Sequence, residues 1–248
     1  MSPQVYESIF SGKKNVKIEA YRKKLTVFFS DIKGFTEITD RLEPEVLSTL
    51  LNSYLNEMSK IALKYGGTID KFVGDAILIF FGDPETKGDK EDAYSCVLMA
   101  LEMQERMHHL KNLWEGQGIT NPLEIRIGIN TGYCNVGNFG SDQRLTYTII
   151  GSEVNVAQRL EASAQPGGIL MSYETYAHAQ DLIEVEQLNS ISMKGVKREI
   201  KVFSALNKIE RINQKKVPSE KLKNVPERIG DRLDALETKI EEILGRIK

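Results

Sequence analysis

Residues 25–36 read LTVFFSDIKGFT, an apolar run of strand length that ends at Asp31 and leads into a short turn. Residues 68–81 read TIDKFVGDAILIFF, in which Gly74 and Asp75 separate two apolar stretches that we expect to be strands. If these strand ends lie side by side, the two carboxylates can hold a pair of divalent cations, a device of phosphoryl chemistry. Taken singly, Asp31 is also typical of a strand-end or capping residue, and Asp75 of a hairpin turn.

The turn that follows Asp31 suits phosphate binding. Gly34, Phe35 and Thr36 offer backbone N–H groups that can face phosphate oxygens. Together with the two aspartates, this turn predicts a nucleotide enzyme rather than a generic α/β domain.

The composition is that of an ordinary soluble domain. The 248 residues are 41% hydrophobic and 27% charged, and a net charge of −2 gives no reason to expect a nucleic-acid partner. No apolar run reaches the ~18 residues that a membrane span needs, and no signal peptide is recognisable. Cys96 and Cys134 have no disulfide or metal spacing, and the three histidines fit no ligand pattern. We therefore expect a cytoplasmic protein without a membrane segment.

The spacing of apolar residues predicts the order of elements after a lead-in segment, residues 1–22. A helix is expected over residues 44–65, where Pro44 opens the first turn and two glycines end an apolar stripe. Other helices are predicted at about residues 91–113 and 152–162. Strands are predicted at residues 25–30, 68–73, 76–81, 123–130, 133–139 and 145–150, with shorter elements to about residue 206. This order predicts an α+β domain, residues 23–206, with a mostly antiparallel sheet.

The end of the chain has a different pattern. Residues 207–226 are polar, contain two prolines and are predicted to form a linker. In residues 227–248, apolar side chains recur at alternating steps of four and three, a three-heptad seam typical of a coiled coil: Ile229, Leu233, Leu236, Ile240, Ile243 and Ile247. The same spacing also fits an amphipathic helix that docks on its own domain, and the two interpretations stay open.

Four segments carry a pattern more specific than any single residue. They are residues 29–36 (FSDIKGFT), 70–81 (DKFVGDAILIFF), 126–140 (RIGINTGYCNVGNFG) and 147–160 (YTIIGSEVNVAQRL). In this order they closely resemble the catalytic domain of class III nucleotidyl cyclases, especially the bacterial adenylate cyclases, over about residues 20–206. The resemblance implies a ferredoxin-like α+β core that dimerises head to tail, with two active sites that are each built from both chains.

The resemblance also implies roles for single residues. Asp31 and Asp75, helped by the backbone carbonyl of Ile32, would bind two Mg²⁺ or Mn²⁺ ions per active site. The partner chain would supply Lys71 and Thr148 as the base-selecting pair, with the lysine donating to adenine N1 and the threonine accepting from the 6-amino group. Animal adenylate cyclases carry an aspartate where this chain has Thr148. Without the surrounding motifs, the two would be read as a solvated lysine and an ordinary strand residue.

The remaining implied residues serve the ribose and the phosphates. Asn155 and Arg159 lie one helical turn apart and so share a face. They match the ribose-orienting asparagine and the transition-state arginine of the family; the alternative is a surface pair on an amphipathic helix. Triphosphate contacts are implied for Arg144 and for Lys194 or Lys197, between which the sequence does not decide. Each of these could also be an exposed loop charge.

The set predicts a homodimeric adenylate cyclase that converts ATP to 3′,5′-cyclic AMP and pyrophosphate in cyclic nucleotide signalling. Guanylate cyclase activity is the nearest alternative, and Lys71 argues against it. A domain that only binds nucleotide, or a scaffold for the C-terminal helix, is disfavoured because no motif residue is lost. A segment resembling residues 2–10 follows a sensor or receiver domain in many bacterial relatives. We therefore expect either an upstream regulatory domain in a longer parent protein or an input through the short flanks.

Overall fold

A mostly antiparallel sheet forms the centre of the protein, as expected for the α+β prediction. The structure, a computed structural model, describes residues 3–12, 18–116, 123–141, 143–192 and 199–209. The sheet runs in the order β2-β3-β1-β4-β6-β8-β7, with β5 paired to β4 outside that path, and only the β4–β6 pair is parallel within the described residues. Its strands are β1 (Ala20–Ile32), β2 (Thr68–Val73), β3 (Ala76–Phe81), β4 (Ile125–Ser141), β5 (Arg144–Ile150), β6 (Ile169–Ser172), β7 (Ile183–Gln187) and β8 (Val202–Lys208).

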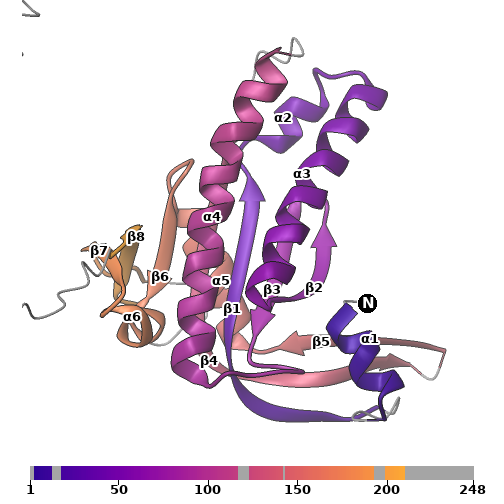
Figure 1. Ribbon diagram of the computed structural model, residues 1–248, viewed down its shortest axis with the longest axis vertical. Coiled ribbons are helices and arrows are strands. Elements are labelled where there is room, and N and C mark those ends of the chain that lie inside the picture. Colours follow the sequence, from indigo (N-terminus) through magenta and orange to yellow (C-terminus); the bar gives the residue numbers. More distant parts are fainter. Residues whose placement is uncertain (1–2, 13–17, 117–122, 142, 193–198, 210–248) are drawn as a thin grey trace, which may run out of the picture. The chain divides into compact units, whose positions relative to one another are not determined.

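Different helices cover the two faces of the sheet. The helices are α1 (Pro3–Phe10), α2 (Phe35–Thr39), α3 (Pro44–Tyr65), α4 (Asp89–Gly116), α5 (Ser152–Ser163) and α6 (Tyr173–Ala179). Helices α3 and α4 lie side by side over the central strands (Figure 1), where their apolar stripes bury Phe28 and Ile32 of β1. Because side chains alternate along a strand, Leu25 and Val27 face the other way, into a smaller cluster that includes Ala157 of α5.

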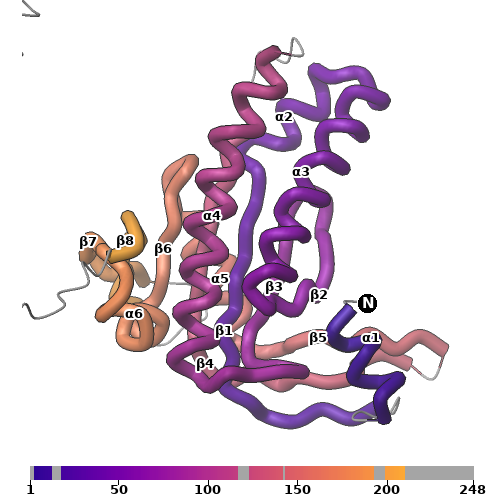
Figure 2. Tube along the Cα trace, in the orientation of Figure 1, coloured from indigo at the N-terminus to yellow at the C-terminus, as the bar shows by residue number. Residues whose placement is uncertain are grey.

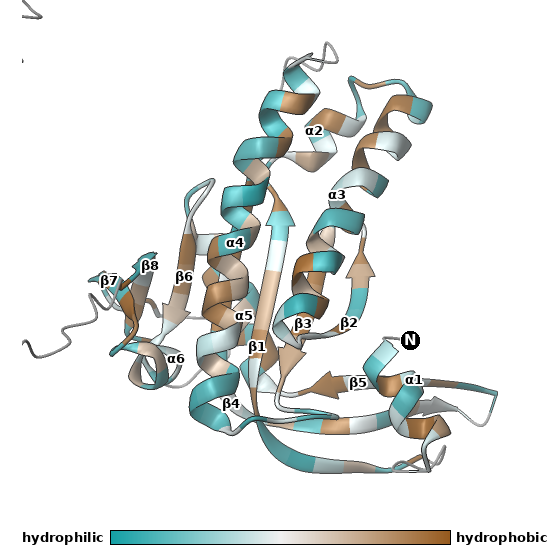
Figure 3. Ribbon diagram, viewed as in Figure 1, coloured by the Kyte–Doolittle hydropathy of each residue, from teal (hydrophilic) through white to brown (hydrophobic). Residues whose placement is uncertain are grey.

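Strand β1 begins earlier than the sequence predicts, at Ala20 instead of residue 25. The added residues are hydrophilic, and Figure 3 shows this part of β1 in teal below its brown centre. They pair with residues 133–137 of β4, and β4 pairs in turn with β5, so that these segments reach sideways below the hairpin β2–β3 (Figure 2). Backbone hydrogen bonds to β4, and not burial of side chains, therefore hold this polar stretch in the sheet.

Other predicted boundaries also shift. The strands expected at residues 123–130 and 133–139 are one continuous β4, because Gly132 stays in the ladder opposite Leu25. The lead-in segment contains α1, whose Val5 is buried in the smaller cluster. The predicted linker beyond Ile209 and the helical tail, residues 227–248, lie outside the described residues. In the part of the chain that is described, no helix is both long and apolar enough to cross a membrane.

Candidate active site

The hairpin β2–β3 brings Asp75 to the end of β1, where Asp31 lies. Ser30 of β1 pairs with Ile77 of β3, so the hairpin turn lies beside the strand end. The backbone N–H of Ile32 donates to Asp75 Oδ2 at 2.9 Å. Burial raises the pKa of Asp75 to about 7, and its hydrogen bond to the Asp31 carboxyl and that group's charge add to the rise, while the Ile32 N–H opposes it. The predicted convergence of the two aspartates is therefore present in the fold.

This carboxylate pair fits a divalent cation. Two like-charged groups held together repel each other unless a proton or a cation lies between them. Mg²⁺ takes oxygen ligands and commonly keeps several waters and substrate phosphates, so it needs only one or two carboxylates from the protein. Within the described ranges, no cluster of three or more His, Cys, Asp or Glu side chains has metal-binding geometry. The pair would thus need further oxygen donors, which a backbone carbonyl, water and nucleotide can supply.

Two charged residues beside Asp31 were missed at the sequence level. Arg126, opposite Asp31 in the β1–β4 ladder, places Nη2 3.3 Å from Asp31 Oδ2 and 2.8 Å from Glu161 Oε1. Burial raises the pKa of Glu161 to about 7, against the lowering effect of Arg126. The alternation of residues 123–130, LEIRIGIN, already put an arginine on one face of a predicted strand, which is the signal that could have found it.

A glycine sets the position of α5 relative to these charges. A Cβ atom at Gly128 would lie 2.1 Å from the Ala157 carbonyl oxygen and 2.2 Å from the Glu161 nitrogen, so only glycine lets the helix approach the strand this closely. The helix buries Val156, Ala157 and Leu160. Asn155 is exposed and Arg159 is half-buried on the same helix, as expected for side chains that face a ligand or solvent.

The predicted phosphate-binding turn becomes the start of a short helix. Gly34 takes a left-handed conformation, with φ of 69°, and α2 begins at the next residue. This φ favours glycine, which has no Cβ. Phe35 packs against the large core, while Thr36 is exposed. The turn is therefore anchored by Phe35 next to the end of β1, and within the described residues no side chain caps the first N–H groups of α2.

A third aspartate joins the two residues predicted to select the base. Thr148 Oγ1 donates to Asp70 Oδ2 at 2.6 Å, and Lys71 Nζ lies 3.5 Å from Asp70 Oδ1. The Asp70 side chain has no exposed surface, and Thr148 is 5% exposed, while 42% of the Lys71 side chain is exposed. The structure thus brings Lys71 and Thr148 together through a residue that sequence reasoning did not single out.

Strand register puts Lys71 and Asp31 on the same face of the sheet. Lys71 is opposite Leu78, and Leu78 is opposite Phe29 of β1. Asp31, two residues after Phe29, shares its face. This is the face opposite to α3 and α4. Within the described residues, however, no hydrogen bond or ion pair joins the Lys71–Asp70–Thr148 group to Asp31 or Asp75, so the chain carries two separate groups.

Of the other predicted phosphate contacts, the structure describes Arg144 but neither of the two lysines. Arg144 is exposed at the start of β5, opposite Ser141. Lys194 and Lys197 lie outside the described residues.

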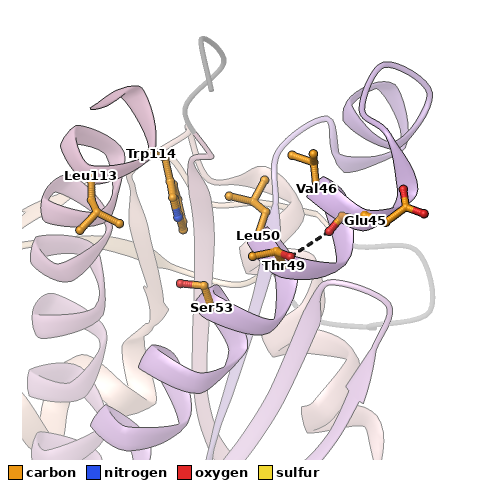
Figure 4. A pocket seen from close by; sticks show the side chains of 7 residues that line it. All are labelled: Glu45, Val46, Thr49, Leu50, Ser53, Leu113 and Trp114. Carbon is orange, nitrogen blue, oxygen red and sulfur yellow. Dashed lines mark hydrogen bonds between the residues drawn. The ribbon is translucent and has the colours of Figure 1, made fainter. Parts of the chain in front are cut away.

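The predicted residues do not line the pocket between α3 and α4. This pocket has a volume of about 390 Å³. Figure 4 shows its lining, with Thr49 donating to the Glu45 carbonyl and the indole of Trp114 facing the α3 side. Its lining residues are Glu45, Val46, Thr49, Leu50, Ser53, Leu113 and Trp114. It therefore lies on the face of the sheet that α3 and α4 cover, and the candidate active site lies on the opposite face.

Comparison with known proteins identifies the family of this fold. The family of the adenylate and guanylate cyclase catalytic domain matches residues 16–207. The crystal structure of the adenylyl cyclase CyaB from P. aeruginosa is 56% identical, with a TM-score of 0.76 over 78% of this chain and 98% of that one. The crystal structure of the guanylyl cyclase Cya2 is 36% identical, with a TM-score of 0.74 over 79% and 98%. Adenylate cyclase 1 of Rhizobium meliloti is 29% identical over 196 residues, which are 78% of this chain but only 29% of that protein.

Proposed function

Because the chain belongs to the adenylate and guanylate cyclase catalytic domain family, we propose that it is an adenylate cyclase whose active sites are shared by two copies of the chain. The ribose 3′-oxygen of ATP attacks the α-phosphorus, the bond from that phosphorus to the bridging oxygen breaks, and pyrophosphate leaves as the 3′-hydroxyl proton is released. The products are 3′,5′-cyclic AMP and pyrophosphate.

The observation that carries this proposal is the placement of two incomplete groups on one face. In the part of the chain that the structure describes, Asp31 and Asp75 form a carboxylate pair that no base-reading group contacts. Lys71 and Thr148 meet at Asp70, and neither of the paired carboxylates contacts them there. A second copy packed head to tail on this face would complete both groups. Such an arrangement has twofold symmetry, which is the commonest symmetry of homo-oligomers.

The first group would hold two divalent cations, Mg²⁺ or Mn²⁺, through Asp31, Asp75 and the carbonyl oxygen of Ile32. When bound, these ions would lower the pKa of the ribose hydroxyl and neutralise charge on the polyphosphate. Gly34 and Thr36, beside this pair, would contribute backbone N–H groups to the phosphates. The open turn after β1 supports this placement.

The second group would come from the partner chain. Lys71 would donate to adenine N1, and Thr148 would accept from the 6-amino group. Asn155 would orient the ribose, and Arg159, four residues later on α5, would stabilise charge that develops at the α-phosphate. Arg144 and one of the lysines of residues 194–197 would contact the triphosphate.

Mixing two inactive variants tests the shared site. Asp31→Ala and Arg159→Ala proteins should each be inactive, because each site needs both groups. In an equal mixture with free exchange, half of the dimers are mixed and each has one intact site, so about a quarter of the wild-type activity should return. Asp31→Ala mixed with Asp75→Ala is the matched control. It should stay inactive, because both changes affect the metal-binding group, so neither site of a mixed dimer is intact.

The assay should compare ATP with GTP in the presence of Mn²⁺, with cyclic nucleotide as the readout. A wild-type protein that makes only cyclic GMP would overturn the base assignment. If mixed dimers form, as shown by differently tagged chains, and the first mixture stays inactive, the shared-site proposal is wrong.

A further inference from the structure

Asp70 lies at an irregularity in the hairpin. Ile69 pairs with Ile79 and Lys71 pairs with Leu78, so Asp70 is an extra residue, a β-bulge, between two consecutive pairs. Bulges re-aim side chains and are over-represented next to active sites. Without the extra residue, Lys71 would fall opposite Ile77, on the face that α3 and α4 cover. The bulge therefore turns Lys71 onto the face of the candidate active site.

The carboxylate of Asp70 is buried and faces donors. The Thr148 hydroxyl donates to Oδ2 at 2.6 Å, and the Ile149 N–H reaches the same oxygen at 3.4 Å. The other oxygen, Oδ1, lies 3.5 Å from the Lys71 ammonium. Burial raises the pKa of Asp70, while the hydrogen bond from Thr148, the charge of Lys71 and the Ile149 N–H lower it. Oδ2 thus accepts both hydrogen bonds, whereas among the described residues the buried Oδ1 has only the ion pair with Lys71.

This arrangement removes the ambiguity of the threonine hydroxyl. A hydroxyl can donate one hydrogen bond and accept two, whereas an ionised carboxylate can only accept. Because Thr148 must donate its proton to Asp70, its oxygen can present only lone pairs to a ligand. Adenine offers a 6-amino donor at this place, and guanine offers a 6-oxo acceptor. An oxygen that can only accept therefore pairs with adenine and faces the guanine oxygen without a hydrogen.

We propose that Asp70 is a positioning residue that selects adenine over guanine nucleotides by fixing Thr148 as a hydrogen-bond acceptor. The inference rests on the proposed function, because it assigns the base-reading step of that same site. It also explains how a threonine can act only as an acceptor toward the base: its hydroxyl proton is already donated to the Asp70 carboxylate.

Asp70→Asn tests the proposal with little change in shape. Its amide can donate to Thr148 and free the hydroxyl proton for guanine, so the ratio of kcat/KM for ATP to that for GTP should fall about tenfold. In the Thr148→Val background the same Asp70→Asn change should leave the ratio within about twofold, because the residue through which it acts is gone. A purely structural role would lower both activities equally in both backgrounds.

Asp92 offers a matched control. It is 6% exposed and accepts from the Thr86 hydroxyl at 2.5 Å and from the Lys87 N–H at 3.0 Å, the same combination of partners at a distant place. Asp92→Asn should leave the ATP-to-GTP ratio unchanged. If Asp70→Asn fails to fold, Asp70→Ser replaces it. A serine also cannot oblige Thr148 to donate its proton, so the ATP-to-GTP ratio should fall by the same amount.

The outcomes separate this inference from the proposed function. If the wild-type protein does not use ATP, the proposed function fails. If it uses ATP and the ratio is unchanged in the Asp70 variants, or falls equally with and without the Thr148 hydroxyl, only the role of Asp70 is overturned.

Discussion

The two carboxylates that flank strand β3, the buried Asp83 and the half-buried Asp75, have opposite surroundings. At one end, Asp83 is 2% exposed and accepts hydrogen bonds from the hydroxyls of Tyr21 and Tyr147, with the Lys23 ammonium 3.1 Å away. At the other end, Asp75 accepts from the backbone N–H of Ile32 and its own backbone N–H, and it faces the Asp31 carboxyl. Donors surround the first carboxylate, and a second carboxylate crowds the other.

The difference shows which carboxylate is structural. Burial raises the pKa of Tyr21 to about 12, with the Asp83 hydrogen bond adding to the rise, so the tyrosine keeps its proton and stays a donor. A buried carboxylate with its donors in place stabilises the fold, because removing it deletes several hydrogen bonds at once. A carboxylate held against a like charge destabilises the apo fold and retains affinity for a cation. We therefore expect substitutions at the two ends of β3 to separate stability from activity.

The largest expected effect follows from Asp75→Asn. Loss of one carboxylate from the proposed two-ion site should reduce cyclic nucleotide formation about 10³-fold or more, since metal ions supply several kcal/mol of transition-state stabilisation. The melting temperature in EDTA should stay the same or rise, because the repulsion with Asp31 is removed. The measurement pairs turnover of ATP with Mn²⁺ and thermal unfolding without metal.

Asp181→Asn is the control for this substitution. Asp181 is exposed, and within the described residues its carboxylate pairs only with the Lys90 ammonium. It should leave both readouts near the wild-type values. Activity of the Asp75→Asn protein within tenfold of wild type would show that this carboxylate holds no essential cation, and a large drop in melting temperature would show that it is structural.

The reverse result is expected at the other end of β3. Asp83→Ala removes the carboxylate that accepts from two tyrosine hydroxyls and pairs with the Lys23 ammonium, which should cost about 3 kcal/mol of unfolding free energy. Turnover per folded molecule should change little. Unfolding in urea, followed by circular dichroism, gives the stability, and Asp83→Asn should fall between alanine and wild type because its amide oxygen still accepts. Equal stability of all three proteins would contradict the comparison.

The sequence predicts one of these two ends far better than the other. Asp31 and Asp75 each follow or interrupt an apolar run, so strand ends alone bring them together. The α+β class III cyclase fold follows from the same strand and helix patterns, and the comparisons confirm it. The donors of Asp83 come from β1 and β5, more than 60 residues away in each direction, and no local pattern links them.

Two further features depend on contacts that no sequence period encodes. The residues of β2, TIDKFV, read as a regular strand, and only the pairing with β3 shows that Asp70 is an extra residue. Arg126 meets Glu161 because Gly128 lets α5 approach β4 closely, which is a matter of tertiary packing. The roles of Asn155 and Arg159 stay predictions that the mixing experiment tests.

The smallest expected effect concerns a carboxylate that has donors but remains close to solvent. Glu102 on α4 is hydrogen-bonded by the Lys64 ammonium at 2.6 Å and by the Tyr65 hydroxyl at 2.6 Å, and 29% of its side chain is exposed. Burial raises the pKa of Glu102, but the hydrogen bonds from Lys64 and Tyr65 and the charge of Lys64 together hold it below the ordinary 4.5. Because the folded pKa is depressed, the ionised group stabilises the fold above pH 4.5, and this contribution is lost as the pH falls through the folded value. Glu102→Gln should therefore cost about 0.5 kcal/mol at pH 7, in line with other solvent-accessible ion pairs, and progressively less as the pH falls from 4.5 through the folded pKa. Urea unfolding of the wild-type and Glu102→Gln proteins across this pH range measures the difference. A cost equal to that of Asp83→Ala, or one that grows as the pH falls, would contradict the expectation. It would show that donor contacts stabilise this carboxylate regardless of its exposure.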